Sequence, residues 1–211
     1  MRNLVITITA AAALTLGGCA RTGDTPANTA AVSDTAAPTV VTRAGAIGEA
    51  FSLYDLGSTW KDQRGETVPL GQLAGKVRVV SLVYTSCHAT CPAILVELKR
   101  IEESIPADRR DDVGFVLVSL DPARDTPGRL ATWAEGNQLD PVRWTLLNGS
   151  EAAVRELAAI LDVRYQQLPD GEVAHANVIT VLDTSGTVVH QQVTLGDETR
   201  RTSAAVNRLL E

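Results

Sequence analysis

Two cysteines at a strand-to-helix junction constrain this chain most. Cys87 and Cys91 follow a mainly apolar run, 77–83, that predicts a buried strand. They precede a segment, 93–101, whose apolar residues recur at helical spacing. Pro92 suits the first helical turn, because its missing N–H removes only a donor that the helix would leave unpaired. The sequence therefore predicts two thiols in the turn that opens a helix.

This position predicts the chemistry of the two thiols. Backbone N–H groups and the helix dipole point at the sulfurs, which lowers a thiol pKa and favours the thiolate that attacks disulfides and binds metal. If the first helical turn winds before Cys91, the four-residue spacing from Cys87 places both sulfurs on one face. The pair can then hold a soft metal or oxidise to a disulfide. A purely structural disulfide is less favoured, because so short a loop gains little entropy.

The first 18 residues predict a signal peptide. They begin with a positive charge and continue with an apolar run, 4–16, which is shorter than the about 20 residues that span a bilayer. The ending Leu16-Gly17-Gly18-Cys19 resembles the lipobox of bacterial lipoproteins, in which the cysteine is lipidated and becomes the first residue of the mature chain. We therefore expect an exported protein, anchored by lipid to a bacterial membrane and facing the periplasm or the outer surface.

Residues 19–45 predict a lipidated N-terminus followed by a flexible tether. They are rich in Ala, Thr, Ser and Pro and show no apolar period. If Cys19 carries lipid, Cys87 and Cys91 remain as one pair of the three cysteines. The export compartment is oxidising, so this pair must be kept reduced if its function needs thiolates.

Residues 46–211 predict one α/β domain with a central mixed sheet flanked by helices, in the thioredoxin order. A formal net charge of −6 without a basic cluster argues against a nucleic-acid partner. The predicted strands are 51–55, 66–68, 77–83, 113–120, 143–147, 177–182 and 187–193, with an extended segment at 163–168. The predicted helices run from the cysteine turn to about Ser104 and over 126–136, 150–161 and 197–210, with one helical turn at 70–73.

Two further features carry candidate chemistry. Asp121 follows the buried strand 113–120, at the edge where open α/β sheets place their sites, although Asp121 and Asp125 also suit plain turn and cap chemistry. His175 precedes the strand 177–182, and the thioredoxin order places the start of this strand beside the cysteine turn. The other two histidines are His88, within the turn, and His190, which we expect on the surface of the last hairpin.

Together these segments resemble the Sco/SenC family of copper-binding, thioredoxin-like proteins over residues 46–211. The resemblance rests on Cys87-His88-Ala89-Thr90-Cys91-Pro92, on Val118-Ser119-Leu120-Asp121-Pro122 through Arg124-Asp125-Thr126-Pro127, and on His175 ahead of Val178-Ile179-Thr180-Val181-Leu182-Asp183. It implies one copper, Cu(I) or Cu(II), bound by Cys87, Cys91 and His175. It also implies a role for Asp121, either in partner contact or in the surroundings of the site.

The resemblance also implies a function. The family helps to load the binuclear copper centre of cytochrome c oxidase subunit II, as a metallochaperone, a thiol reductant, or both. A periplasmic copper donor and a thiol reductant are further expected partners. Many members carry proline after the first cysteine, where this chain has His88. This difference would alter the thiol pKa or offer the metal an extra ligand.

Residue chemistry is consistent with copper but leaves alternatives open. Two thiolates and one imidazole suit Cu(I), whereas structural zinc usually takes four protein ligands. A thiol–disulfide oxidoreductase, with Cys87 and Cys91 catalytic, is one alternative. Such enzymes usually have two residues between their cysteines and a proline near position 175, whereas this chain has three residues between the cysteines and no proline near 175. A peroxiredoxin expects threonine where Tyr84 stands. A redox sensor that acts through protein contact is a further alternative.

The lipobox yields the first testable prediction. A Cys19→Ser variant should lose lipid labelling and membrane association, because it lacks the sulfur that carries the lipid, while the domain still folds. Labelled fatty acid and membrane fractionation in a bacterial host measure both properties. Wild-type protein that takes up no labelled fatty acid would show that the lipobox interpretation is wrong.

Overall fold

The computed structural model describes residues 51–88, 90–196 and 198–211. They belong to one compact unit, residues 47–211. The predicted signal peptide, Cys19 and the tether lie outside the described residues. Among the residues described, no helix is both long enough and apolar enough to cross a membrane.

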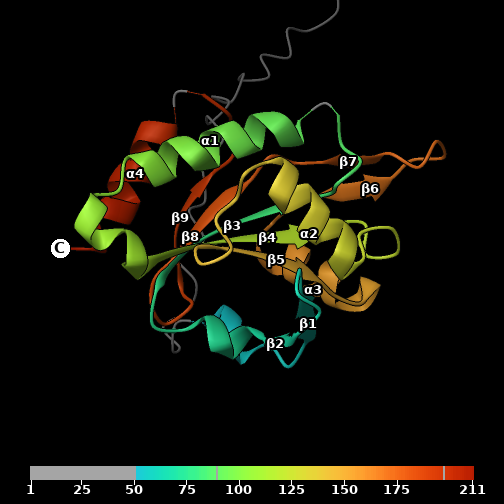
Figure 1. The fold of residues 1–211 in the computed structure, drawn as a ribbon, viewed down its shortest axis with the longest axis horizontal. Helices are drawn as coiled ribbons and strands as arrows, with labels where there is room; N and C mark the ends of the chain where they lie inside the picture. The colour runs from blue at the N-terminus through green and yellow to red at the C-terminus, as the bar shows by residue number, and fades with distance from the viewer. Residues whose placement is uncertain (1–50, 89, 197) are drawn as a thin grey trace, which may run out of the picture. The chain divides into compact units, whose positions relative to one another are not determined.

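A seven-stranded mixed sheet forms the centre of this unit, as the sequence predicts (Figure 1). Its central strands pair in parallel, β3 with β4 and β4 with β5, and the outer pairs are antiparallel. In spatial order the strands are β2 (Thr67–Pro69), β1 (Thr59–Asp62), β5 (Trp144–Asn148), β4 (Val113–Ser119), β3 (Val77–Val83), β8 (Ile179–Leu182) and β9 (Val188–Gln192).

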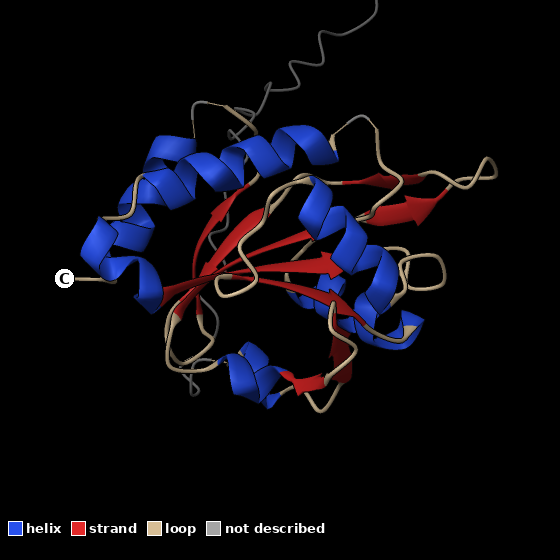
Figure 2. Ribbon diagram, viewed as in Figure 1, coloured by secondary structure: helices blue, strands red, loops and turns tan. Residues whose placement is uncertain are grey.

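Four α-helices and three short 3₁₀ helices flank the sheet in the described residues (Figure 2). They are α1 (Cys91–Glu103), α2 (Pro127–Gly136), α3 (Glu151–Ile160), α4 (Thr199–Arg208), η1 (Leu53–Asp55), η2 (Leu70–Leu73) and η3 (Ala107–Asp112). The predicted starts of α2 and α3 are confirmed, because the side chains of Thr126 and Ser150 accept hydrogen bonds from the backbone N–H groups of Arg129 and Ala153. Helices α1 and α4 pack together (Figure 1).

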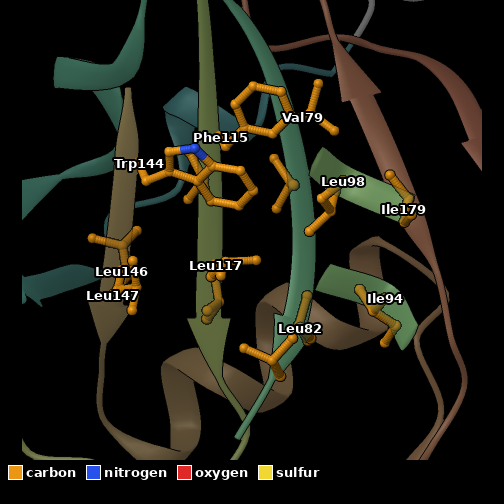
Figure 3. Packing of buried hydrophobic residues seen from close by; sticks show 14 of the residues in the cluster. Val79, Leu82, Ile94, Leu98, Phe115, Leu117, Trp144, Leu146, Leu147 and Ile179 are labelled. Carbon is orange, nitrogen blue, oxygen red and sulfur yellow. The ribbon is translucent and has the colours of Figure 1, made fainter. Parts of the chain in front are cut away.

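The central strands are buried on both faces. All seven residues of β4 are buried, which is typical of a parallel strand covered by helices on both sides. On one face Phe115 stacks on Trp144 with ring centroids 4.5 Å apart (Figure 3). The Trp144 Nε1–H donates to Glu102 of α1 (3.2 Å). On the other face Val116 and Leu157 of α3 line the same small apolar hollow. The packed sheet gives the strand ends fixed positions.

Strand direction brings the predicted site segments to one edge of the sheet. The parallel strands β3 and β4 end at the same edge, and β8, antiparallel to β3, begins there with Ile179 opposite Ser81. The cysteine turn follows β3, the Asp121 loop follows β4, and His175 precedes β8. The fold therefore brings together segments that are far apart in the sequence.

Three local predictions differ from the structure. Residues 51–55 were expected to form a strand, but 53–55 form η1, because the Ser52 hydroxyl accepts a hydrogen bond from the Tyr54 N–H and caps it. The strand β1 was not predicted. The last helix begins at Thr199 rather than at Asp197, which lies outside the described residues.

The segment before β8 forms a hairpin that the sequence did not predict. Strand β6 (Tyr165–Gln167) pairs with β7 (Val173–His175) in a separate two-stranded antiparallel sheet. His175 is thus the last residue of a strand, with Tyr165 directly across from it. The predicted extended segment, 163–168, contains the first strand of this hairpin.

Candidate metal centre

Three predicted ligands lie together at the edge of the sheet. The Sγ atoms of Cys87 and Cys91 and a ring nitrogen of His175 all lie within 4.8 Å of one another. The distance from Cys91 Sγ to His175 Nε2 is 3.7 Å. Both cysteine side chains are thiols and are buried, and the imidazole is half-buried.

The cysteine turn places one sulfur at the first N–H of the helix. The Cys87 N–H donates to the Tyr84 carbonyl (3.2 Å), which closes the turn. Helix α1 begins at Cys91, whose N–H donates to Cys87 Sγ (3.3 Å) and is thus satisfied by a side chain. The condition under which both sulfurs would share one helical face is not met, because Cys87 precedes the helix, but the turn still brings the two Sγ atoms within 4.8 Å of each other.

The two sulfurs have different surroundings. Burial raises the pKa of the Cys91 thiol, and the neighbouring Cys87 adds to the rise, while a backbone hydrogen bond from Tyr84 opposes it. The side chain lies in the core, with Cys91 only 1% exposed. For Cys91, desolvation thus outweighs the helix N-terminus that was expected to lower the pKa. At Cys87 the N–H of Cys91 favours negative charge on the sulfur.

The imidazole of His175 is oriented as a metal ligand requires. Its Nδ1 lies 3.1 Å from the Ala176 carbonyl oxygen, which can only accept, so we assign the proton to Nδ1. The lone pair of Nε2 then faces Cys91. A hydrogen bond from the second ring nitrogen to a carbonyl is the usual support of a metal-binding histidine. A hollow of about 370 Å³ beside His175, shared with Arg164 and Tyr165, opens to solvent.

A fully buried carboxylate anchors the cysteine turn. Asp125 Oδ2 accepts hydrogen bonds from the Thr85 N–H (3.0 Å) and the Ser119 hydroxyl (2.7 Å), and Oδ1 accepts from the Thr85 hydroxyl (2.5 Å). Arg129 Nε lies 3.8 Å from Oδ1 and compensates its charge. Asp125 therefore ties the turn to the end of β4. Its sequence position before a helix indicated only cap chemistry.

Asp121 lies outside the three-donor group. Its buried carboxylate accepts a hydrogen bond from Arg124 Nε, and the same guanidinium donates to the Gly171 carbonyl in the turn of the β6–β7 hairpin. Asp121 is therefore linked through Arg124 to the hairpin that carries His175. This burial favours the second of its two expected roles, in the surroundings of the site.

Tyr84 is a residue of this site whose role the sequence did not indicate. Its ring meets the imidazole of His175 edge-on, with centroids 5.9 Å apart and an interplanar angle of 79°. Its hydroxyl donates to Glu172 Oε2 (2.7 Å) and accepts from the Val173 N–H (3.3 Å). Burial and the bond to Glu172 raise the pKa of Tyr84, so the hydroxyl stays protonated. The sequence signal that could have indicated this role is an aromatic residue with a hydroxyl group directly beside the cysteine turn.

The other two histidines lie outside the three-donor group. His88 is exposed in the cysteine turn. His190 was expected on the surface but is half-buried, with Nε2 3.0 Å from the Thr202 hydroxyl of α4, and burial lowers its pKa.

The donor set fits one soft metal ion. Two sulfurs and one imidazole nitrogen are mutually within reach of a single ion, and in the described residues no fourth Cys, His, Asp or Glu joins the group. Thiolates favour Cu(I), imidazole also suits Cu(II), and a closed structural zinc site would need another ligand.

Comparisons with known proteins agree with this geometry. A family model described as SCO1/SenC matches residues 41–211. A SCO1 protein homologue of Bacillus subtilis is 27% identical over 134 residues, which cover 62% of this chain and 69% of the relative. Copper-bound ScoI of Bradyrhizobium japonicum is 26% identical with a TM-score of 0.62, covering 72% of this chain and 96% of that one. Apo Sco1 of Thermus thermophilus is 28% identical with a TM-score of 0.56, covering 79% and 98%. The expected thioredoxin-like fold is confirmed.

The burial of Cys91 yields a prediction about its reactivity. In a Cys19→Ser, Cys87→Ser variant, Cys91 is the remaining thiol, and its alkylation rate should rise with a midpoint above the free value of about 8.5. The folded form holds this proton where the unfolded chain releases it, so its contribution to the free energy of unfolding is present below about pH 8.5 and is lost as pH rises. Alkylation of the same variant in urea is the control. A folded-state midpoint below the urea value would contradict the prediction.

Proposed function

Since this chain belongs to the SCO1/SenC family, we propose that it is a copper metallochaperone that carries one copper ion between Cys87, Cys91 and His175. The observation that carries the proposal is the convergence of these three donors from two distant segments at one edge of the sheet. The ion is cargo, and the chain's own residues bind, orient and release it.

Copper loading depends on the protonation and the redox state of the cysteines. Thiolates bind copper, so the buried Cys91 must release its proton as the ion enters, and affinity should rise with pH. A Cys87–Cys91 disulfide would remove two of the three donors. A three-coordinate site leaves room for a ligand from a partner, which allows transfer without prior release of the ion.

The proposed recipient is the binuclear copper centre of cytochrome c oxidase subunit II. This assignment is supported by membership of the family and by the donor set, which suits delivery of a single copper ion. A periplasmic copper donor and a thiol reductant would supply the ion and keep the pair reduced. We place the protein outside the cytoplasmic compartment, anchored to a bacterial membrane through lipid on Cys19.

The cysteine turn also supports a second function, thiol–disulfide exchange with a partner. The Cys91 N–H favours a thiolate at Cys87, which would attack a partner disulfide, and the adjacent Cys91 thiol would resolve the mixed disulfide. The Cys87–Cys91 pair would be oxidised to a disulfide as the partner gains two electrons and two protons as a dithiol. A sensor that signals its redox state by protein contact would use the same pair.

The contribution of His175 distinguishes the two functions. His175→Ala should weaken copper binding by at least about 10-fold, with a larger loss for Cu(II), because imidazole favours Cu(II) more than thiolates do. The Cys87–Cys91 potential should stay close to that of wild type. Copper affinity, disulfide potential and cytochrome c oxidase activity, measured in one strain series, test these expectations.

His190→Ala is the matched control, because it removes a half-buried histidine that lies outside the three-donor group. A metallochaperone should lose support of oxidase assembly in His175→Ala and keep it in His190→Ala. Unchanged copper affinity in His175→Ala would refute the ligand assignment and make His88 the next candidate. Normal assembly despite weak copper binding would favour the reductase.

A further inference from the structure

The position of His175 depends on side-chain hydrogen bonds to the hairpin that carries it. In the described part of the chain, β6 and β7 pair with each other and with no strand of the seven-stranded sheet. Figure 1 shows this hairpin extending beyond the end of α1. Backbone pairing with the main sheet therefore does not hold β7 beside the cysteine turn. The Tyr84 hydroxyl bonds Val173 of β7 and the adjacent Glu172 instead, and Arg124 bonds Gly171 in the turn of the hairpin.

Tyr84 contacts the cysteine turn through its backbone and His175 through its ring. Its carbonyl accepts from the Cys87 N–H (3.2 Å), and its ring edge meets the imidazole of His175. Tyr84 is only 3% exposed, so its orientation is set by packing. It belongs to the chain segment of the cysteines and contacts the segment of the histidine.

The hydroxyl of Tyr84 holds the strand that carries His175. It accepts from the Val173 N–H (3.3 Å) and donates to Glu172 (2.7 Å). Val173 lies two residues before His175, and alternate residues of a strand point to the same face. The hydroxyl thus holds β7 at Val173, whose side chain lies on the same face of the strand as the imidazole of His175.

We propose that the Tyr84 hydroxyl is a positioning group that sets how strongly His175 contributes to copper binding, and with it the relative affinity for Cu(II) and Cu(I). This inference rests on the proposed copper function. Thiolates are the preferred donors of Cu(I), so the imidazole contributes less to Cu(I) binding, whereas Cu(II) depends more on a well-placed imidazole. Loss of a group that orients a ligand typically weakens metal binding by about 10- to 100-fold.

The test is Tyr84→Phe, which keeps the buried ring and removes the hydroxyl. Cu(II) affinity should fall by about 10-fold or more, and Cu(I) affinity should fall less. The absorption and electron paramagnetic resonance spectra of the Cu(II) form should change, because the imidazole is displaced. The Cys87–Cys91 potential should stay unchanged. In the metal-free protein, hydrogen exchange of the Val173 amide should become faster, because its acceptor is lost.

Two variants control for loss of a hydroxyl and for conservative change. Tyr54→Phe removes a tyrosine hydroxyl that donates to the Leu73 carbonyl, away from the three donors, and should leave both copper affinities unchanged. Glu172→Gln keeps an acceptor for the Tyr84 hydroxyl and should bind Cu(II) nearly as wild type does.

The outcomes separate this inference from the function on which it rests. Wild type that binds copper, together with a Tyr84→Phe variant of unchanged Cu(II) affinity and spectrum, would overturn the positioning role alone. An equal loss of Cu(II) affinity in Tyr54→Phe would also overturn it, by showing an unspecific effect. Wild type that binds neither Cu(I) nor Cu(II) would overturn the proposed function and this inference with it.

Discussion

The pairing of β3 with two neighbours of opposite direction is the constraint on which the rest of the structure depends. Parallel pairing with β4 places the cysteine turn beside the Asp125 loop, and antiparallel pairing with β8 brings the start of β8 to the same edge. The donors Cys87 and His175 are thereby brought together although they are far apart along the chain. The central strands that carry these segments are almost wholly buried, as is typical of parallel strands covered on both faces.

Polar side chains hold in place the segments that the sheet brings together. The cysteine turn has irregular backbone near the core, and buried polar groups cost free energy unless they are hydrogen-bonded. Asp125 satisfies the backbone and hydroxyl of Thr85, and Cys87 Sγ satisfies the first N–H of α1. Tyr84 then attaches the β6–β7 hairpin to this turn, and Arg124 attaches the same hairpin to Asp121. The same atoms that stabilise the turn therefore orient the ligands.

Much of this arrangement could be predicted from sequence, for identifiable reasons. Apolar runs with clear caps, such as Thr126-Pro127, predict the central strands and helices, and strand order then predicts that His175 lies near the cysteines. The β6–β7 hairpin was missed because its strands are short and largely exposed, with no apolar alternation. The raised pKa of Cys91 was not predicted, because burial depends on how α1 packs and not on helix position alone. Tyr84 bonds Glu172 and Asp125 bonds Thr85, partners distant in sequence that no local pattern contains.

The central claim is that two thiolates and one imidazole of a single chain hold one copper ion. The X-ray absorption spectrum at the copper edge, recorded on reduced protein loaded with Cu(I), tests it most directly. The account predicts one copper per chain with two sulfur neighbours and one nitrogen neighbour. Copper surrounded by sulfur alone and shared between two chains would contradict it.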